Sequence, residues 1–339
     1  MRTRMAIERV SSWVLIGIVL AFGSSCGSND PSSEEAEAND DVEVSQETSS
    51  TTPEVEDVLG FDRGDEDIFG DVTAGGGSIW VASVDGLIEV DPSTMTATWH
   101  EGIAPGRPIT YAFDSLWVAN GAEFVVRRVD PETLEVQAEV PAGSPEGLVA
   151  GPNGVWVTEH QHGVIERIDP ATNTVAETVT IGSPAQRGPM DPTFVGDDIW
   201  FVVPNEGTIV RVDPDGGVSR VPFSESSLAP VGSADAVWVP LGVAGVARID
   251  RETQEVTTVP PPEGVTGAYA GVSIDAMPWF VGPDGMFAVD PATSEVFGTV
   301  PLHGGSPRNV VVTDEAAWVM GERPGTLERV SLDRLATSS

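Results

Sequence analysis

The sequence contains no lysine. All 17 of its basic residues are arginines, against 53 Asp and Glu, which gives a formal net charge of −36. Without lysine, neither a Schiff-base lysine nor a P-loop lysine is possible. The shortage of positive charge argues against an ordinary nucleic-acid binder, because phosphate contacts need a surplus of cations. We therefore expect no nucleic-acid partner.

Cysteine and histidine are also scarce. The single cysteine, Cys26, excludes an internal disulfide and an all-cysteine metal site. Four histidines leave little room for a histidine-rich metal site. The period of an amphipathic helix is absent, whereas 37 Gly, 27 Pro and 40 % apolar residues predict a large core joined by many turns.

The N-terminus has the organisation of an export signal, which we assign to residues 1–25. Arg2, Arg4 and Arg9 precede a nine-residue apolar run at 14–22. That run is far shorter than the ~20 residues a membrane-spanning helix needs, so a signal peptide is the better interpretation.

The signal ends in Gly-Ser-Ser before Cys26, which resembles a bacterial lipobox, although Gly23 stands where that pattern usually has Leu. A lipid on Cys26 would anchor the protein outside the cytoplasmic membrane, in the cell envelope. The alternative is ordinary cleavage near Gly23, leaving a free thiol. Residues 26–57 then form an acidic tether with 11 acidic and no basic residues, too polar to order itself.

A sevenfold repeat occupies the rest of the chain, at 58–335, followed by a short tail at 336–339. Seven tryptophans are spaced by 37, 39, 44, 38, 41 and 39 residues, and a second mark, mostly Asp-Pro, follows each by 11 to 13. Each period holds four short β runs separated by turn signals. The sequence therefore predicts an all-β, seven-bladed β-propeller of four-stranded antiparallel blades, which we expect to be a monomer.

The repeated residues have structural explanations. Asp-Pro suits the turn between the third and fourth strands, and the tryptophans suit packing between blades. Arginines recur in five third strands, and repetition at one position favours ion pairs between strands or blades: Arg128, Arg167, Arg211, Arg248 and Arg329. The last repeat lacks a fourth strand, so we expect residues near 54–61 to supply the outer strand of the last blade.

Two segments carry a family resemblance. LWVAN at 116–120 followed by RVDPET at 128–133 resembles the YVTN-type propeller repeat, and WVTEH at 156–160 followed by IERIDP at 165–170 resembles the repeat of the streptogramin (virginiamycin B) lyases. The resemblance covers about 58–332. It implies the propeller fold, whereas these propellers include enzymes, ligand binders and scaffolds.

The loops after the second and fourth strands of each blade should emerge on one face. These loops carry the candidate ligand-binding residues Arg107, Arg187, Arg308, Asn120 and Glu206. They are either solvated loop residues or a site for a small anionic or polar ligand at the mouth of the central channel.

Glu159, His160 and His162 form the one cluster with acid–base or metal potential. In the lyase family, carboxylates hold magnesium and a histidine acts as the base that opens a cyclic ester by elimination. The resemblance thus implies that Glu159 could bind Mg²⁺ or Ca²⁺ and that the histidines could be catalytic. The facing blades carry no histidine at this position, so a polar loop tip is the competing interpretation.

Two functional classes follow. The first is a lipid-tethered extracytoplasmic propeller that binds a small ligand or an unknown protein partner. The second is a metal-dependent, lyase-like enzyme. A quinone-cofactor dehydrogenase shares the architecture, but the sequence shows no mark specific to that cofactor.

Overall fold

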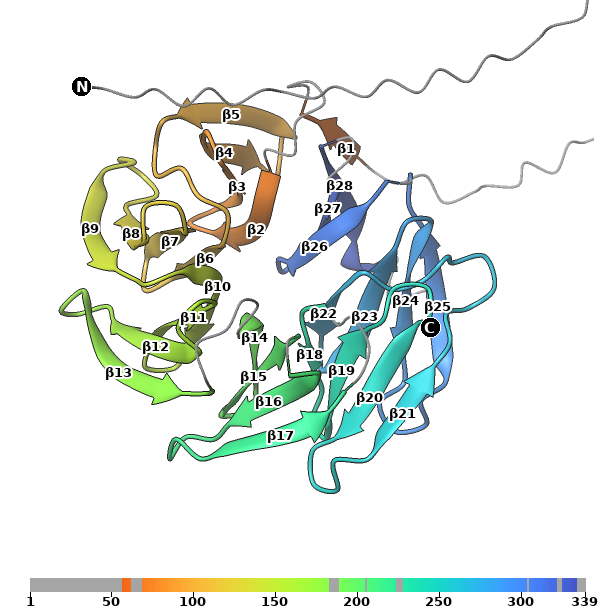
Figure 1. Cartoon of the computed structure of the whole chain (residues 1–339). Coiled ribbons are helices and arrows are strands. Elements are labelled where there is room, and N and C mark those ends of the chain that lie inside the picture. The colour runs from red at the N-terminus through yellow and green to blue at the C-terminus, as the bar shows by residue number, and fades with distance from the viewer. Residues whose placement is uncertain are drawn as a thin grey trace, which may run out of the picture. The chain divides into compact units, whose positions relative to one another are not determined.

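The structure is a computed structural model that describes residues 57–61, 69–182, 189–204, 206–223, 228–303, 305–321 and 325–333. These residues form seven four-stranded antiparallel sheets, which follow one another around a central axis (Figure 1). The predicted seven-bladed propeller is confirmed. Within the described ranges, no helix is long and apolar enough to cross a membrane.

The blades follow the order of the sequence, each from its inner to its outer strand. Blades 1 to 3 are β2 (Phe69–Gly75), β3 (Ser78–Ser83), β4 (Gly86–Asp91), β5 (Thr96–Glu101); β6 (Ile109–Ala112), β7 (Ser115–Asn120), β8 (Val125–Val129), β9 (Val136–Pro141); and β10 (Pro145–Gly151), β11 (Gly154–Glu159), β12 (Val164–Asp169), β13 (Thr174–Thr180). Blades 4 and 5 are β14 (Met190–Val195), β15 (Asp198–Val203), β16 (Thr208–Val212), β17 (Val218–Pro222); and β18 (Val231–Gly232), β19 (Ala236–Pro240), β20 (Val246–Asp250), β21 (Val256–Val259). Blades 6 and 7 are β22 (Ala270–Ile274), β23 (Met277–Gly282), β24 (Gly285–Val289), β25 (Val296–Pro301); and β26 (Pro307–Val312), β27 (Ala316–Gly321), β28 (Thr326–Ser331), with β1 (Asp57–Gly60) outermost.

Strand β1 closes the ring, as the sequence predicted. It pairs antiparallel with β28, Val58 opposite Glu328 and Leu59 opposite Leu327. Phe61 follows, and its N–H donates to the Gly325 carbonyl at 2.8 Å. Its ring is buried in the core shared by blades 7 and 1. The last blade is thus completed by a segment from the other end of the chain, which fastens the ring without a disulfide.

Each repeat tryptophan packs in the core between its own blade and the next. Trp117 of blade 2 contacts Val155 and Val157 of blade 3 in one apolar cluster. Trp318 of blade 7 joins Ile79 of blade 1 in another. A single blade cannot bury both faces, so these clusters supply the packing that holds neighbouring blades together.

The repeated aspartates cap turns, as predicted. In the turn between β8 and β9, one Asp130 oxygen accepts the N–H groups of Glu132 and Thr133 at 2.9 Å each. These hydrogen bonds hold the pKa of the Asp130 carboxyl below its ordinary value. Leu134 completes the turn in the left-handed region, at φ 61°.

The repeated arginines also have the predicted structural role. Each lies directly opposite the tryptophan of its own blade; Arg128, for example, pairs with Trp117 and stacks 5.3 Å from its ring. Four form ion pairs: Arg167 with Glu177, Arg211 with Asp198, Arg248 with Asp235, and Arg329 with Glu315. Arg128 differs, because it donates to the Pro170 carbonyl of the next blade at 2.6 Å.

Candidate functional site

The inner strands of all the blades begin at one end of the axis, here called the entrance end. Near this end, β2, β10, β14 and β26 pair irregularly with the second strand of their blade. In β2, Gly70 and Asp71 together face one residue of β3. Similar β-bulges contain Glu146 in β10, Asp191 in β14 and Arg308 in β26. A bulge bends its strand and turns a side chain in a new direction. Here the four bulges present charged side chains at the same end of the ring.

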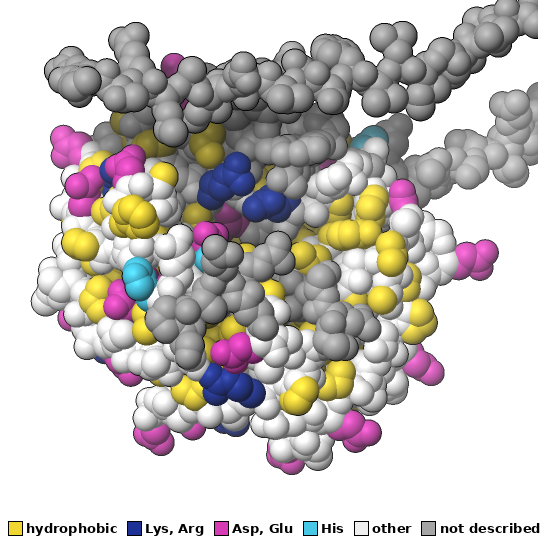
Figure 2. Space-filling model, in the orientation of Figure 1, with side chains coloured by type: hydrophobic (Ala, Val, Ile, Leu, Met, Phe, Trp, Pro, Cys, Tyr) yellow, Lys and Arg dark blue, Asp and Glu magenta, His cyan; other side chains and the backbone are white. Residues whose placement is uncertain are grey.

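We call Asp71, Glu146, Asp191, Arg308 and the adjacent Asn309 the entrance cluster. Figure 2 shows arginine and acidic side chains gathered where this face of the molecule is hollowed at its centre. The remaining inner strands begin with uncharged residues: Ile109, Val231 and Ala270.

Asp71 joins three blades. Its carboxylate accepts the N–H of Val72 at 2.8 Å, the N–H of Ile109 in blade 2 at 3.3 Å, and the side-chain amide of Asn309 in blade 7. Despite these hydrogen bonds, burial among protein atoms raises the pKa of Asp71 to about 6, and the charge of Asp191 adds to the rise.

Asp191 is held in the left-handed region, at φ 48°. Its side chain is only partly exposed, and the loss of solvent raises its pKa to about 6. The charge of Glu146 contributes to this rise, and the charge of Arg308 opposes it. The entrance cluster therefore holds two interacting carboxylates that keep a proton to unusually high pH.

Two of the predicted arginines lie against Gly70. Arg308 donates through Nε to the Gly70 carbonyl at 2.8 Å. A Cβ on Gly70 would lie 2.6 Å from the Arg107 Cα, so glycine is required for this close approach. The backbone before β6 is also irregular. The Arg107 N–H donates to the Ala119 carbonyl, but the Ala119 N–H donates to the next residue, at the Pro108 carbonyl.

Two other predicted residues form hydrogen bonds to the segment that precedes the first strand of their own blade. The Asn120 amide donates to the Pro105 carbonyl at 2.8 Å. The buried Glu159 carboxylate accepts the N–H groups of Gly143 and Ser144 at 2.6 and 2.8 Å. Both side chains hydrogen-bond to backbone groups of these segments, which is a structural role.

Glu206 acts similarly, through an arginine. It accepts from Arg220 Nε at 3.1 Å, and the same guanidinium donates to the Ile181 carbonyl in the connection before blade 4. The two remaining predicted residues, Arg187 and the lipidation residue Cys26, lie outside the described residues.

The predicted histidine cluster gathers around Glu159. His162 Nδ1 lies 3.1 Å from a Glu159 oxygen, and the His160 N–H donates to the Ser144 carbonyl at 2.9 Å. Burial, together with the charge of Glu159, raises the pKa of nearby Glu166.

The predicted metal does not suit the donors at Glu159. Both Glu159 oxygens already accept backbone hydrogen bonds, a poor arrangement for Mg²⁺ or Ca²⁺, which need open oxygen ligands. In the described part of the chain, no group of three His, Cys, Asp or Glu residues could hold a metal ion. Metal binding by Glu159 stays a prediction that the donor geometry does not support.

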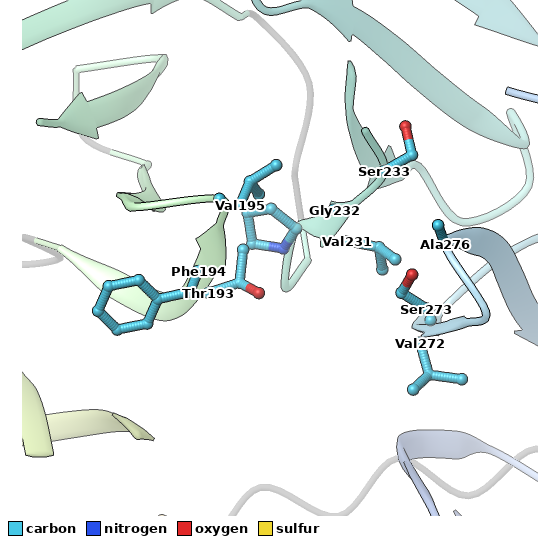
Figure 3. A pocket seen from close by; sticks show the side chains of 12 residues that line it. Thr193, Phe194, Val195, Val231, Gly232, Ser233, Val272, Ser273 and Ala276 are labelled. Carbon is cyan, nitrogen blue, oxygen red and sulfur yellow. The ribbon is translucent and has the colours of Figure 1, made fainter. Parts of the chain in front are cut away.

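A cavity of about 370 Å³ opens at the other end of the inner strands, between β14, β18 and β22. Figure 3 shows Val231, Val272 and Ser273 around the same space. Strand β18 has only two residues, so the inner wall of blade 5 is short there. The lining carries no charged residue, unlike the entrance cluster.

Comparison with solved structures agrees with this architecture. A streptogramin B lyase structure aligns over 81 % of this chain and 97 % of its own, at 16 % identity and a TM-score of 0.66. The fold is the same. Virginiamycin B lyase from Staphylococcus aureus aligns over 81 % of this chain and 99 % of its own, at 17 % identity and a TM-score of 0.65. BamB from Moraxella catarrhalis aligns over 78 % and 85 %, at 18 % identity and a TM-score of 0.54. No protein-family model and no curated protein matches the chain.

Asp71, Glu146, Asp191 and Asn309 were not among the site residues predicted from the sequence. The available signal was a charged or amide residue beside Gly or Pro at the start of an inner strand, as in Gly70-Asp71 and Asp191-Pro192. Lining up the seven first strands would have placed these residues at one end of the ring.

Proposed function

We propose that this protein is a lipid-anchored propeller outside the cytoplasmic membrane, and that its entrance cluster binds a small polar ligand. The observation that carries the proposal is the pair of partly buried aspartates, Asp71 and Asp191, whose pKa values are both raised to about 6. Ionised carboxylates in such surroundings reduce stability, and groups kept at a cost in stability are typical of functional sites.

The arrangement also suits binding on geometric grounds. The cluster projects from inner strands that are hydrogen-bonded to the next strand of their blade, and not from exposed loop tips. Arg308 is fixed by Gly70 and Asn309 by Asp71. Polar side chains held in this way lose little freedom when a ligand binds.

The proposed anchor is supported by the sequence alone. A basic start, a nine-residue apolar run and small residues before the single cysteine precede 31 residues, 27–57, that contain 11 acids and no base. A flexible tether of this length would reach ~30 Å, enough to hold the propeller clear of a membrane surface.

One contact favours the enzyme alternative. His162, 54 % exposed, lies 3.1 Å from Glu159 on the face that carries the entrance cluster, so its imidazole could act as a base. Against this, the described inner strands contain no histidine. One similar solved structure is a catalytically inactive His-to-Ala variant of virginiamycin B lyase from Staphylococcus aureus with quinupristin.

Anchoring is tested by Cys26→Ser and fractionation of expressing cells. The wild-type protein should sediment with membranes and the variant should appear in the aqueous fraction. A variant that still sediments with membranes contradicts the anchor.

Binding is tested by a thermal-shift screen of inorganic phosphate, simple amines, simple carboxylates and amino acids. At least one class should raise the Tm of the wild type and leave an Asp191→Asn/Arg308→Gln variant unchanged. A wild type that responds to no class contradicts a binding function at this site. Quinupristin incubated with wild type and His162→Ala, followed by chromatography of ring-opened product, tests the lyase alternative.

A further inference from the structure

The charged residues of the entrance cluster lie on two walls of the ring, Asp71 and Arg308 on blades 1 and 7, and Glu146 and Asp191 on blades 3 and 4. Arg308 comes from β26 in blade 7 and lies against β2 of blade 1. Glu146 and Asp191 come from β10 and β14, in blades 3 and 4. In a ring of seven, blade 4 lies across the axis from blades 7 and 1 (Figure 1).

These charges are close enough to influence one another. Arg308 lowers the pKa of Asp191, Glu146 raises it, and Asp191 raises the pKa of Asp71. The inner strands surround one axis, so the strand beginnings that carry these residues converge on the same opening from both walls (Figure 1).

Each simpler ligand meets repulsion. A plain anion drawn to Arg308 approaches Asp71, Glu146 and Asp191, and a plain cation drawn to the carboxylates approaches Arg308 and, beside Gly70, Arg107. A molecule with one charge of each sign can pair its carboxylate with Arg308 while its ammonium offsets the repulsion from Asp71, Glu146 and Asp191.

The two aspartates of the entrance cluster differ in the hydrogen bonds that they accept. Asp71 is engaged by Val72, Ile109 and Asn309. By contrast, none of the described residues donates a hydrogen bond to the Asp191 carboxylate. An ammonium group carries several donors and can satisfy Asp191, whereas a carboxylate matches the guanidinium of Arg308.

We propose that the entrance cluster binds a small zwitterion, an ammonium and a carboxylate on one short chain as in an amino acid, with the ammonium at Glu146 and Asp191 and the carboxylate at Arg308. This inference rests on the proposed binding function and specifies its ligand class.

The test is a length series of ω-amino acids, from glycine to 6-aminohexanoate, measured by isothermal titration calorimetry. For each length, the matched alkylamine and the matched alkylcarboxylate are titrated separately. One length should bind at least about tenfold more tightly than both matched compounds. Asp191→Asn and Arg308→Gln should each weaken it about tenfold or more, and Arg167→Gln, an outer-blade control, should not.

The outcomes separate the two proposals. An amine or acid that binds as tightly as the amino acid, and is lost in the same variants, contradicts the zwitterion but leaves the binding function. If the amino acids fail while phosphate or another class gives a thermal shift, the zwitterion is again contradicted alone. If no class binds at all, both proposals fail.

Proton release gives a second readout. The charges of Arg308 and Glu146 act on Asp191, and the charge of Asp191 raises the pKa of Asp71. An ammonium beside Asp191 favours its ionised form. Titrations at about pH 6 in buffers of different ionisation enthalpy should show protons released on binding, and the release should disappear at about pH 8. Proton uptake at pH 6, or no linkage, contradicts an ammonium at Asp191.

Discussion

Replacing Asp191 by Asn should stabilise the protein at neutral and alkaline pH. The pKa of Asp191 rises from 3.8 to about 6, a little over two pH units, and one unit corresponds to about 1.4 kcal/mol. The ionised side chain therefore costs at most about 3 kcal/mol. Because water reaches part of the side chain, and because Arg308 opposes the effect, we expect a gain of about 1–2 kcal/mol. Asn also tolerates the left-handed backbone conformation of this position.

The gain should depend on pH with a definite sign. Between about pH 4 and pH 6 the folded protein holds a proton on Asp191 that the unfolded chain releases, so the contribution of Asp191 to the free energy of unfolding falls as pH rises through this window. Asn does not ionise, so the free energy of unfolding of the variant does not fall for this reason. The difference between the two proteins should be close to zero at about pH 4 and complete above about pH 7.

Urea unfolding of wild type and Asp191→Asn at about pH 4 and pH 8 measures this difference directly. Asp197→Asn, at an exposed position in the turn before β15, serves as the matched control and should show no such pH-dependent gain. A variant less stable than wild type at pH 8, or a difference equal at both pH values, would contradict a raised pKa at Asp191.

Two further predictions concern the scaffold. Gly70→Ala should lower the free energy of unfolding by about 1–3 kcal/mol in urea titrations, because the new Cβ meets the Arg107 backbone at 2.6 Å; Gly60→Ala, with nothing within 4 Å, should be nearly neutral, and equal effects would contradict this packing. Deleting residues 27–62, which removes β1 and Phe61, should lower the Tm by about 10 °C or more in a thermal melt. Deleting 27–48 should leave the Tm unchanged, and a similar fall in both would contradict ring closure by β1.

The fold was readable from the sequence because its determinants repeat. A tryptophan and a turn aspartate recur at nearly constant intervals, and each instance has the same physical cause, packing between blades or capping of a turn. The closing strand followed from counting, because the last repeat has three strands and one is needed from elsewhere. Strand β18 is an exception, because the repeat pattern does not predict that this inner strand has only two residues.

The candidate site was much less predictable. A bulge depends on which residues of two strands lie opposite each other, and the pattern of apolar residues does not show that two residues of β14 face one of β15. The apolar pattern alone therefore does not select Asp191 as a site residue. Glu159 was noticed for its histidine neighbours, but its hydrogen bonds to Gly143 and Ser144 link positions 15 and 16 residues apart, and only the folded blade shows them.

We propose that the entrance holds two coupled carboxylates prepared for binding. Carbon-13 NMR of aspartate carboxyl groups across the pH range tests it most directly, with signals assigned from Asp71→Asn and Asp191→Asn. Two aspartates should titrate near pH 6, and Asp191→Asn should remove one and lower the midpoint of Asp71, whose pKa the Asp191 charge raises. Aspartates that all titrate below about pH 5, or an Asp71 midpoint unchanged by the substitution, would contradict the claim.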